Sequence, residues 1–208
     1  MQPFTVVTAV AAPLDIAKID TGMIVPGRFQ RLPRRPGHTD YARVFLHDLR
    51  FDEHERPRPE FILNQAAYHP AGILVTGPDF GCGSSRESAA CATLDFGVRA
   101  LIGASFGDVY RGNCMQNGVL TIVLPQPVIS SLLAQLQASP GAAMTVDLSH
   151  QTVTAPDGST HAFDIDATRK ERLLKGLDDV GVTLQHLAQI ETFEKQYRTD
   201  MPWLAHLI

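Results

Sequence analysis

Three short apolar runs in the middle of the chain constrain the fold most strongly. They occupy residues 72–76, 98–104 and 119–124 and are rich in Val, Ile and Leu, a composition typical of strands buried on both faces of a sheet. Helical segments, residues 89–96 and 106–114, separate them. Strand, helix, strand, helix and strand in succession imply a parallel sheet with covering helices, so the sequence predicts an α/β fold.

Strand signals also flank this central unit. Residues 5–11 predict a first strand that Pro13 would end. Residues 144–165 contain short alternating segments around the hairpin dipeptide Asp157-Gly158 and predict a β-meander. The predicted sheet is therefore mostly parallel, with an antiparallel part.

The end of the chain has helical signals only. They predict helices over residues 169–175 and 184–197. We therefore expect an α/β domain over residues 1–166 and, over residues 167–208, a C-terminal helical extension of the same domain.

Composition limits the class of protein. The chain has 208 residues, 44% hydrophobic and 19% charged, with a net charge of −4. This is typical of an ordinary globular protein and gives no reason to expect nucleic acid or a membrane as partner. Cysteines too few and scattered for a disulfide framework indicate a reducing cytoplasm. The three cysteines, Cys82, Cys91 and Cys114, form no C-x-x-C pair, so we expect no metal or cofactor on this chain itself.

The stretch from Phe80 to Ser88 is the strongest candidate for a binding site. It joins a predicted strand to a predicted helix, whose first N–H groups have no intrahelical partner and attract anions. Gly81 and Gly83 allow close approach of a ligand to the backbone, and Ser84, Ser85 and Arg86 follow at once. Because an arginine can bind a carboxylate through two hydrogen bonds, the stretch predicts a site for a small polycarboxylate.

A purely structural interpretation of this stretch stays open. Ser84 and Glu87 have the spacing of a capping box, which needs no ligand. Capping would explain those two residues but not the glycine pair, Ser85 or Arg86. A third glycine at dinucleotide-binding spacing and the closing glycine of a nucleophile elbow are both lacking.

Two segments near the N-terminus have weaker signals. Asp20 and Thr21 can form an Asx-type turn, and in isolation that is the better interpretation. Residues 28–37 are basic, contain prolines and lack periodicity, as solvated loops do. Their arginines, Arg28 first, could also attract an anionic substrate or an acidic partner surface.

Four separated motifs, in order, resemble the small subunit of 3-isopropylmalate dehydratase in the aconitase superfamily. Residues 20–26, Asp-Thr-Gly-Met-Ile-Val-Pro, are similar to the family's D-T-D-x-I-I-P, and residues 80–87 are similar to its F-G-x-G-S-S-R-E. Residues 104–120 resemble its S-F-A-D-I-F-x-x-N…N-x-L-L segment, and residues 176–186 resemble the tail of its longer members. The resemblance covers nearly the whole chain.

The resemblance implies a swivelling β/β/α domain that closes over a catalytic cleft of a separate large subunit. That partner would hold a [4Fe-4S] cluster through three cysteines of its own. The implied activity is that of a hydro-lyase in leucine biosynthesis, which converts 2-isopropylmalate to 3-isopropylmalate by dehydration and rehydration. The substrate would be a small dicarboxylate.

The same match implies roles for individual residues. Ser84 matches the superfamily's catalytic base, and Ser85 and Arg86 would stabilise its anion. The expected substrate-binding residues are Asp20, Thr21, Arg28, Gly83 and Arg86. Arg28 belongs to a loop, residues 28–35, that lies where the family has its substrate-selecting loop.

Two departures from the family pattern lie close to this site. Gly22 replaces a usual aspartate, and Ser88 replaces a usual histidine. They keep open a related hydro-lyase for another hydroxy-diacid, of methylated malate or citramalate type, and a subunit of reduced activity. A non-enzymatic domain that senses a dicarboxylate is the alternative from a different class.

Overall fold

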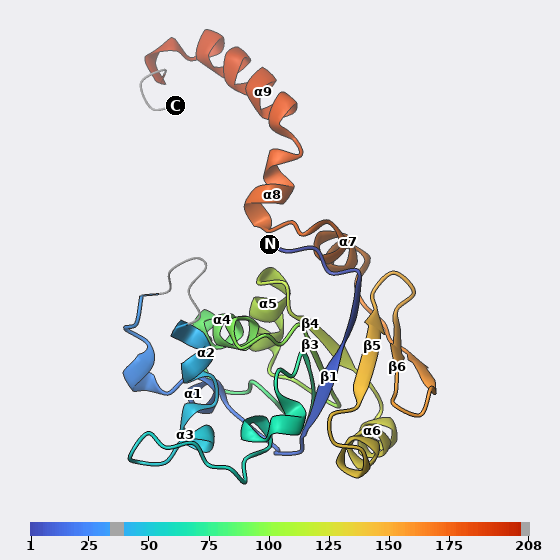
Figure 1. Ribbon diagram of the computed structural model, residues 1–208. Helices are drawn as coiled ribbons and strands as arrows, with labels where there is room; N and C mark the ends of the chain where they lie inside the picture. The colour runs from blue at the N-terminus through green and yellow to red at the C-terminus, as the bar shows by residue number, and fades with distance from the viewer. Residues whose placement is uncertain (34–39, 205–208) are drawn as a thin grey trace.

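The protein contains a mixed β-sheet covered by helices on both faces (Figure 1). The structure, a computed structural model, describes residues 1–33 and 40–204. The strand order among these residues is β4-β3-β2-β1-β5-β6-β7. The strands are β1 (Val6–Leu14), β2 (Ile73–Thr76), β3 (Ala100–Gly103), β4 (Leu120–Val123), β5 (Ala143–Asp147), β6 (Thr152–Thr154) and β7 (Thr160–Ala162).

The pairing of the strands confirms the predicted α/β class. β1, β2, β3 and β4 pair in parallel, and β5, β6 and β7 continue from β1 as an antiparallel meander. The parallel half is built as predicted, because α4 (Glu87–Asp95) connects β2 to β3 and α5 (Asp108–Gln116) connects β3 to β4. Parallel pairs thus account for one half of the sheet and antiparallel pairs for the other.

Each face of the sheet has its own hydrophobic core. Leu74 and Leu101 pack with α4, α5 and the segments between β1 and β2. Ile73, Val75 and Ile102 point to the other face and pack against α6 (Gln126–Ala138). This alternation along short, fully buried strands explains their near-continuous apolar sequence.

The prediction that Pro13 ends the first strand is wrong. β1 runs on to Leu14, and Pro13 lies in register with Val75 of β2. β1 pairs with β5 only as far as Val10. The last backbone hydrogen bond on the β5 side of β1 runs from Ala11 N to Ala142 O at 3.1 Å. The missing N–H of Pro13 therefore falls where the strand has no neighbour on that side.

Short helices fill the connection from β1 to β2. They cover the core of the face that carries α4. They are α1 (Thr21–Ile24), η1 (Gly27–Phe29), α2 (Asp40–Val44), α3 (His47–Arg50), η2 (Ile62–Asn64) and η3 (Ala66–Tyr68).

The chain ends in a helical arm that projects from the domain (Figure 1). It consists of α7 (Ala167–Lys175), α8 (Asp179–Leu184), α9 (Leu187–Asp200) and η4 (Pro202–Leu204). The helix predicted over residues 184–197 is wrong in extent, because Gln185 and His186 separate α8 from α9. The division between domain and extension at residue 166 stays a prediction.

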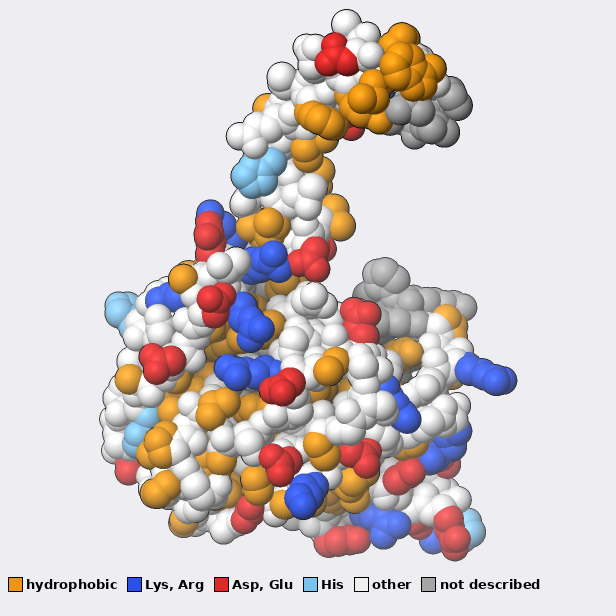
Figure 2. All heavy atoms as spheres, turned by 180° about the vertical axis from the view of Figure 1, so that it is seen from behind, with side chains coloured by type: hydrophobic (Ala, Val, Ile, Leu, Met, Phe, Trp, Pro, Cys, Tyr) orange, Lys and Arg blue, Asp and Glu red, His pale blue; other side chains and the backbone are white. Residues whose placement is uncertain are grey.

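The outer part of the arm contributes no buried side chain. None of the residues of α8 or α9 is buried, and hydrophobic side chains lie along its surface in Figure 2. The large exposed ones are Val180, Leu184, Leu187, Phe193, Met201 and Trp203. None of the helices among the described residues is long and apolar enough to cross a membrane.

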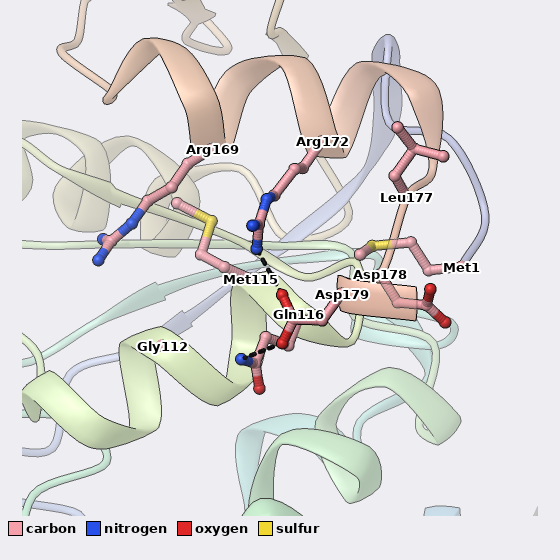
Figure 3. A pocket seen from close by; sticks show the side chains of 9 residues that line it. All are labelled: Met1, Gly112, Met115, Gln116, Arg169, Arg172, Leu177, Asp178 and Asp179. Carbon is pink, nitrogen blue, oxygen red and sulfur yellow. Dashed lines mark hydrogen bonds and ion pairs between the residues drawn. The ribbon is translucent and has the colours of Figure 1, made fainter. Parts of the chain in front are cut away.

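Polar contacts fasten the base of the arm to the domain (Figure 3). Gln116 of α5 donates to Asp179 of α8 at 3.3 Å, and the amino group of Met1 donates to Gly176 O at 2.9 Å. Within the arm, Arg172 of α7 pairs with the same carboxylate of Asp179 at 2.6 Å. They line a cavity of about 190 Å³ that shares no residue with the predicted site.

Candidate active site

Two segments that are far apart in the sequence meet at one edge of the sheet. β1 and β2 are parallel neighbours, so the chain leaves both at the same edge, where ligands bind in open α/β sheets. Gly81 N donates to Ile19 O at 2.7 Å, and Thr21 N donates to Cys82 O at 3.0 Å. The structure therefore brings the predicted Asp20–Thr21 turn against the predicted glycine turn.

The two glycines of this turn are required by its geometry. Gly81 has φ +76°, and a Cβ there would lie 2.1 Å from Cδ1 of the buried Tyr110. Gly83 has φ +90°, and a Cβ there would lie 3.4 Å from that of Asp20. Both glycines thus have a positive φ, which other residues rarely adopt.

The capping-box interpretation of Ser84 and Glu87 is wrong. α4 begins at Glu87, its N-cap is Arg86, and no side chain caps it. The backbone of Arg86 is extended, with φ −136° and ψ 104°, so Ser84 lies two residues before the cap position. Glu87 instead accepts a hydrogen bond of 3.3 Å from Asn117 Nδ2. The start of α4 is left as an uncapped set of N–H groups.

The hydroxyl groups of Ser84 and Ser85 face solvent at this uncapped start. Both residues are exposed, and within the described part of the chain neither hydroxyl has a hydrogen-bond partner. The backbone is held instead, because Thr21 Oγ1 donates to Ser84 O at 2.8 Å. Both side chains are thus available to a ligand while the loop that carries them is fixed.

Arg86 is half-buried beside the serines, and its guanidinium is held by neutral oxygens. Nη1 donates to Val25 O at 3.4 Å. With the Gln30 amide turned so that its oxygen faces the guanidinium, Oε1 accepts from Nε at 3.0 Å and from Nη1 at 2.9 Å. The reverse orientation would set N–H groups against N–H groups. No acceptor among the described residues engages Nη2, which remains for a ligand.

Asp20 and Thr21 use their side chains within the chain. Asp20 caps α1, and its Oδ1 accepts from Gly22 N at 2.6 Å and Met23 N at 2.8 Å, so the Asx-type turn is confirmed. Thr21 is buried. Their predicted contact with substrate stays a prediction. In the structure, Asp20 caps α1 and Thr21 holds the glycine turn.

Arg28 lies in a separate cluster. It forms a two-pronged ion pair with Asp48, and its Nη2 lies 3.2 Å from His47 Nδ1. The hydrogen bonds from Arg28 hold the pKa of Asp48 below its ordinary value. The structure does not bring Arg28 into contact with Ser84 or Arg86, and its role in substrate binding stays a prediction. Arg34 and Arg35 lie outside the described residues.

The cysteines do not fit the ligand set of a metal cluster. Cys91 and Cys114 are buried and Cys82 is half-buried. Burial raises the pKa of the Cys114 thiol to about 12. Within residues 1–33 and 40–204, no three His, Cys, Asp or Glu side chains gather as a metal site.

Sequence reasoning missed Gln30 as a residue of the site. Its amide reaches Arg86 from the basic segment after η1. A single glutamine in an aperiodic loop has no spacing or motif that would indicate such a contact. Only the path of the chain from β1 to β2 brings it there.

Comparison with known proteins identifies the family. A family model described as "Aconitase C-terminal domain" matches residues 1–127, and one described as "LeuD_N" matches residues 130–167. A third, which describes the C-terminal domain of the 3-isopropylmalate dehydratase small subunit, matches residues 179–206. The chain is 48% identical to the 3-isopropylmalate dehydratase small subunit of Rhodospirillum rubrum, over 98% of this chain and 97% of that protein. It is 46% identical to that of Parvibaculum lavamentivorans, over 98% of this chain and all of that protein.

The chain belongs to the 3-isopropylmalate dehydratase small-subunit family. A solved member, the 3-isopropylmalate dehydratase protein of Methanocaldococcus jannaschii, shares the fold with a TM-score of 0.65. The likeness covers 90% of this chain and 99% of that one at 21% identity. Because this chain belongs to that family, its predicted aconitase-type swivelling domain is confirmed.

Proposed function

We propose that this chain is the closing subunit of a 3-isopropylmalate dehydratase and that it brings Ser84, Ser85 and Arg86 to a cleft of a separate large subunit. One observation carries the proposal. The two serine hydroxyls and Nη2 of Arg86 lie unpartnered among the described residues at the uncapped start of α4. The small-subunit names of the relatives support the existence of a large partner.

Ser84 acts as the base in this account. In the dehydration, Ser84 Oγ takes the proton from the carbon next to the one that loses hydroxide, and an alkene diacid forms. In the rehydration, water adds to the alkene with H and OH in exchanged positions, so the atoms balance without an oxidant or a reductant. A serine hydroxyl is a weak base, and its anion needs donors nearby. The uncapped N–H groups of α4 and the charge of Arg86 supply them in a closed site from which water is excluded.

Arg86 binds a carboxylate of the substrate. Its side chain is half-buried and its contacts are with neutral oxygens. None of these contacts neutralises the guanidinium, so its full positive charge can attract a carboxylate of the ligand. Gly83, exposed beside it, lets the ligand approach the backbone.

The [4Fe-4S] cluster belongs, in this proposal, to the large subunit. Among the described residues of this chain, no three His, Cys, Asp or Glu side chains gather to hold it. The catalytic contribution of this chain is then to bind, to orient and to move a proton.

Gly22 favours a second candidate, a small subunit for another hydroxy-diacid. The site has no side chain at this position, and a Cβ there would lie 3.5 Å from Arg86 Nη1. Because the departure is beside the carboxylate-binding residue, it bears on which diacid fits.

A domain that only senses a dicarboxylate would bind its ligand without any partner.

Co-expression of the full chain with the large subunit of its host tests the proposal. The purified complex should contain iron and should interconvert 2- and 3-isopropylmalate, followed by the ultraviolet absorbance of the alkene diacid. The chain alone should be inactive. A complex that turns over only citramalate would favour the second candidate, and dicarboxylate binding by the lone chain without any complex would favour the sensor.

A further inference from the structure

The contact between Gln30 and Arg86 is the least expected feature of the site. Gln30 comes from the basic segment after η1, Arg86 from the residue before α4, and they are far apart in the sequence. One amide oxygen accepts from two nitrogens of the guanidinium, Nε at 3.0 Å and Nη1 at 2.9 Å. Within the described part of the chain, this is the contact that engages Nε.

Gln30 completes a set of acceptors that begins with the main chain. Nη1 also donates to the carbonyl oxygen of Val25, at 3.4 Å. Val25 is buried, so its carbonyl is fixed by the core. Gln30 therefore accepts from Nε and Nη1, and Nη2 has no acceptor among the described residues.

The charge of these acceptors matters for a residue that binds an anion. A carboxylate in the same place would hold Arg86 equally well but would neutralise it. Position 22 could have supplied one, because a Cβ there would lie 3.5 Å from Nη1, but this chain has glycine. Among the described residues Arg86 forms no ion pair, so it is oriented without loss of charge.

We propose that Gln30 is the positioning residue of Arg86, which it orients as a neutral acceptor so that Nη2 is presented to a substrate carboxylate. The inference rests on the proposed function for the identity of the substrate. The contact itself does not depend on it. The segment that carries Gln30 thereby takes part in substrate binding through Arg86.

The first test measures the guanidinium directly in the full chain. The Arg86 Nε–H signal, assigned by its absence from Arg86→Lys, should exchange slowly with water in a ¹⁵N-resolved NMR spectrum. Gln30→Met keeps the length of the side chain but removes the acceptor, so exchange should become about tenfold faster, the scale of one lost hydrogen bond. Gln30→Glu restores an acceptor and should restore slow exchange.

The matched control carries the same substitution on the opposite face of the sheet. Gln126, exposed at the start of α6, bonds only to Ser130 among the described residues. Gln126→Met should leave the Arg86 signal unchanged.

The second test uses the assembled enzyme. Gln30→Met should raise KM about five- to tenfold, with a smaller change in kcat, because a neutral hydrogen bond to the substrate-binding group is lost. An unchanged Nε–H exchange, or an unchanged KM, overturns the proposal. A lower KM also overturns it, since Gln30 would then occupy the place of the substrate carboxylate. If the wild-type complex has no isopropylmalate activity, the proposed function fails, and the exchange measurement still decides whether Gln30 orients Arg86.

Discussion

The hydroxyl of Thr21 donates a hydrogen bond of 2.8 Å to the carbonyl oxygen of Ser84, 63 residues further along the chain. Thr21 is 1% exposed, so the donor of this bond is buried, while Ser84 is exposed. The bond fixes the backbone of the proposed base and leaves the Ser84 hydroxyl free. A motif near the N-terminus thus holds a motif in the middle of the chain through one side chain.

Thr21→Val tests this bond, because it keeps the shape of the side chain and leaves the Ser84 carbonyl without its donor. The free energy of unfolding should fall by about 1 kcal/mol, the usual net contribution of one hydrogen bond. Turnover of the complex should fall as well, because the loop is no longer fixed. Denaturant unfolding and steady-state kinetics check the two effects. Thr21→Ser keeps the donor and should keep most of the turnover; if both variants lose turnover equally, the hydrogen bond is not the cause.

Arg86→Lys tests the guanidinium. A lysine keeps the charge but cannot donate to Val25 and Gln30 and still present a further nitrogen to the ligand. Turnover should fall by about 100-fold or more, since the planar fork is lost. The free energy of unfolding should fall by only about 1 kcal/mol, the scale of the hydrogen bonds lost to Val25 and Gln30. Wild-type turnover in this variant would refute the assigned role.

Gly22→Asp tests the departure from the family pattern. A Cβ at this position would lie 3.0 Å from Asp20 Oδ1 and 3.5 Å from Arg86 Nη1. The new carboxylate should pair with Arg86 and raise the KM for the dicarboxylate several-fold. Gly22→Asn introduces nearly the same shape without charge and serves as the control. Equal KM values in the two variants would show that charge beside Arg86 is unimportant.

The parallel half of the sheet and the glycine turn could be predicted because their causes are local. Strands such as Ile73–Thr76 are buried on both faces, and their sequence has to be apolar throughout. Gly81 has φ +76° and lies against Tyr110. Because glycine is the residue that adopts a positive φ readily, its presence in the sequence indicates the turn.

Other features depend on contacts that no local pattern encodes. Ser84 and Glu87 have capping-box spacing, but the extended Arg86 backbone moves the helix start beyond them. Pro13 continues its strand because the pairing of β1 with β5 stops before it, at Val10, and Gln30 joins the site only through the path of a long connection. In each case a contact with a residue distant in the sequence determines the local structure.

Asp48 should make the stability of the chain depend on pH at the acidic end. Its native pKa lies below the ordinary value because of Arg28, so the ion pair stabilises the fold above the unfolded-state pKa of about 3.9. That contribution is lost as the pH falls through the lower native pKa. Both side chains are about half exposed, 54% and 53%, so its size is about 1 kcal/mol or less.

The unfolding free energies of wild type and Asp48→Asn should therefore differ at pH 7 and converge as the pH falls below the lowered native pKa of Asp48. The control is Asp164→Asn, at an exposed carboxylate without an ion pair among the described residues. A difference between wild type and Asp48→Asn that persists at acid pH would mean that the ion pair is not its source.

The central claim is that this chain supplies the base of the reaction, and Ser84→Ala in the assembled complex tests it most directly. The variant should bind the large subunit and its iron as wild type does, because the Ser84 hydroxyl has no partner among the described residues. Its kcat for isopropylmalate should fall by about 100- to 10,000-fold, the range for loss of a general base. Ser130→Ala, on α6 across the sheet, should retain full activity. A Ser84→Ala complex that turns over at the wild-type rate would contradict the account.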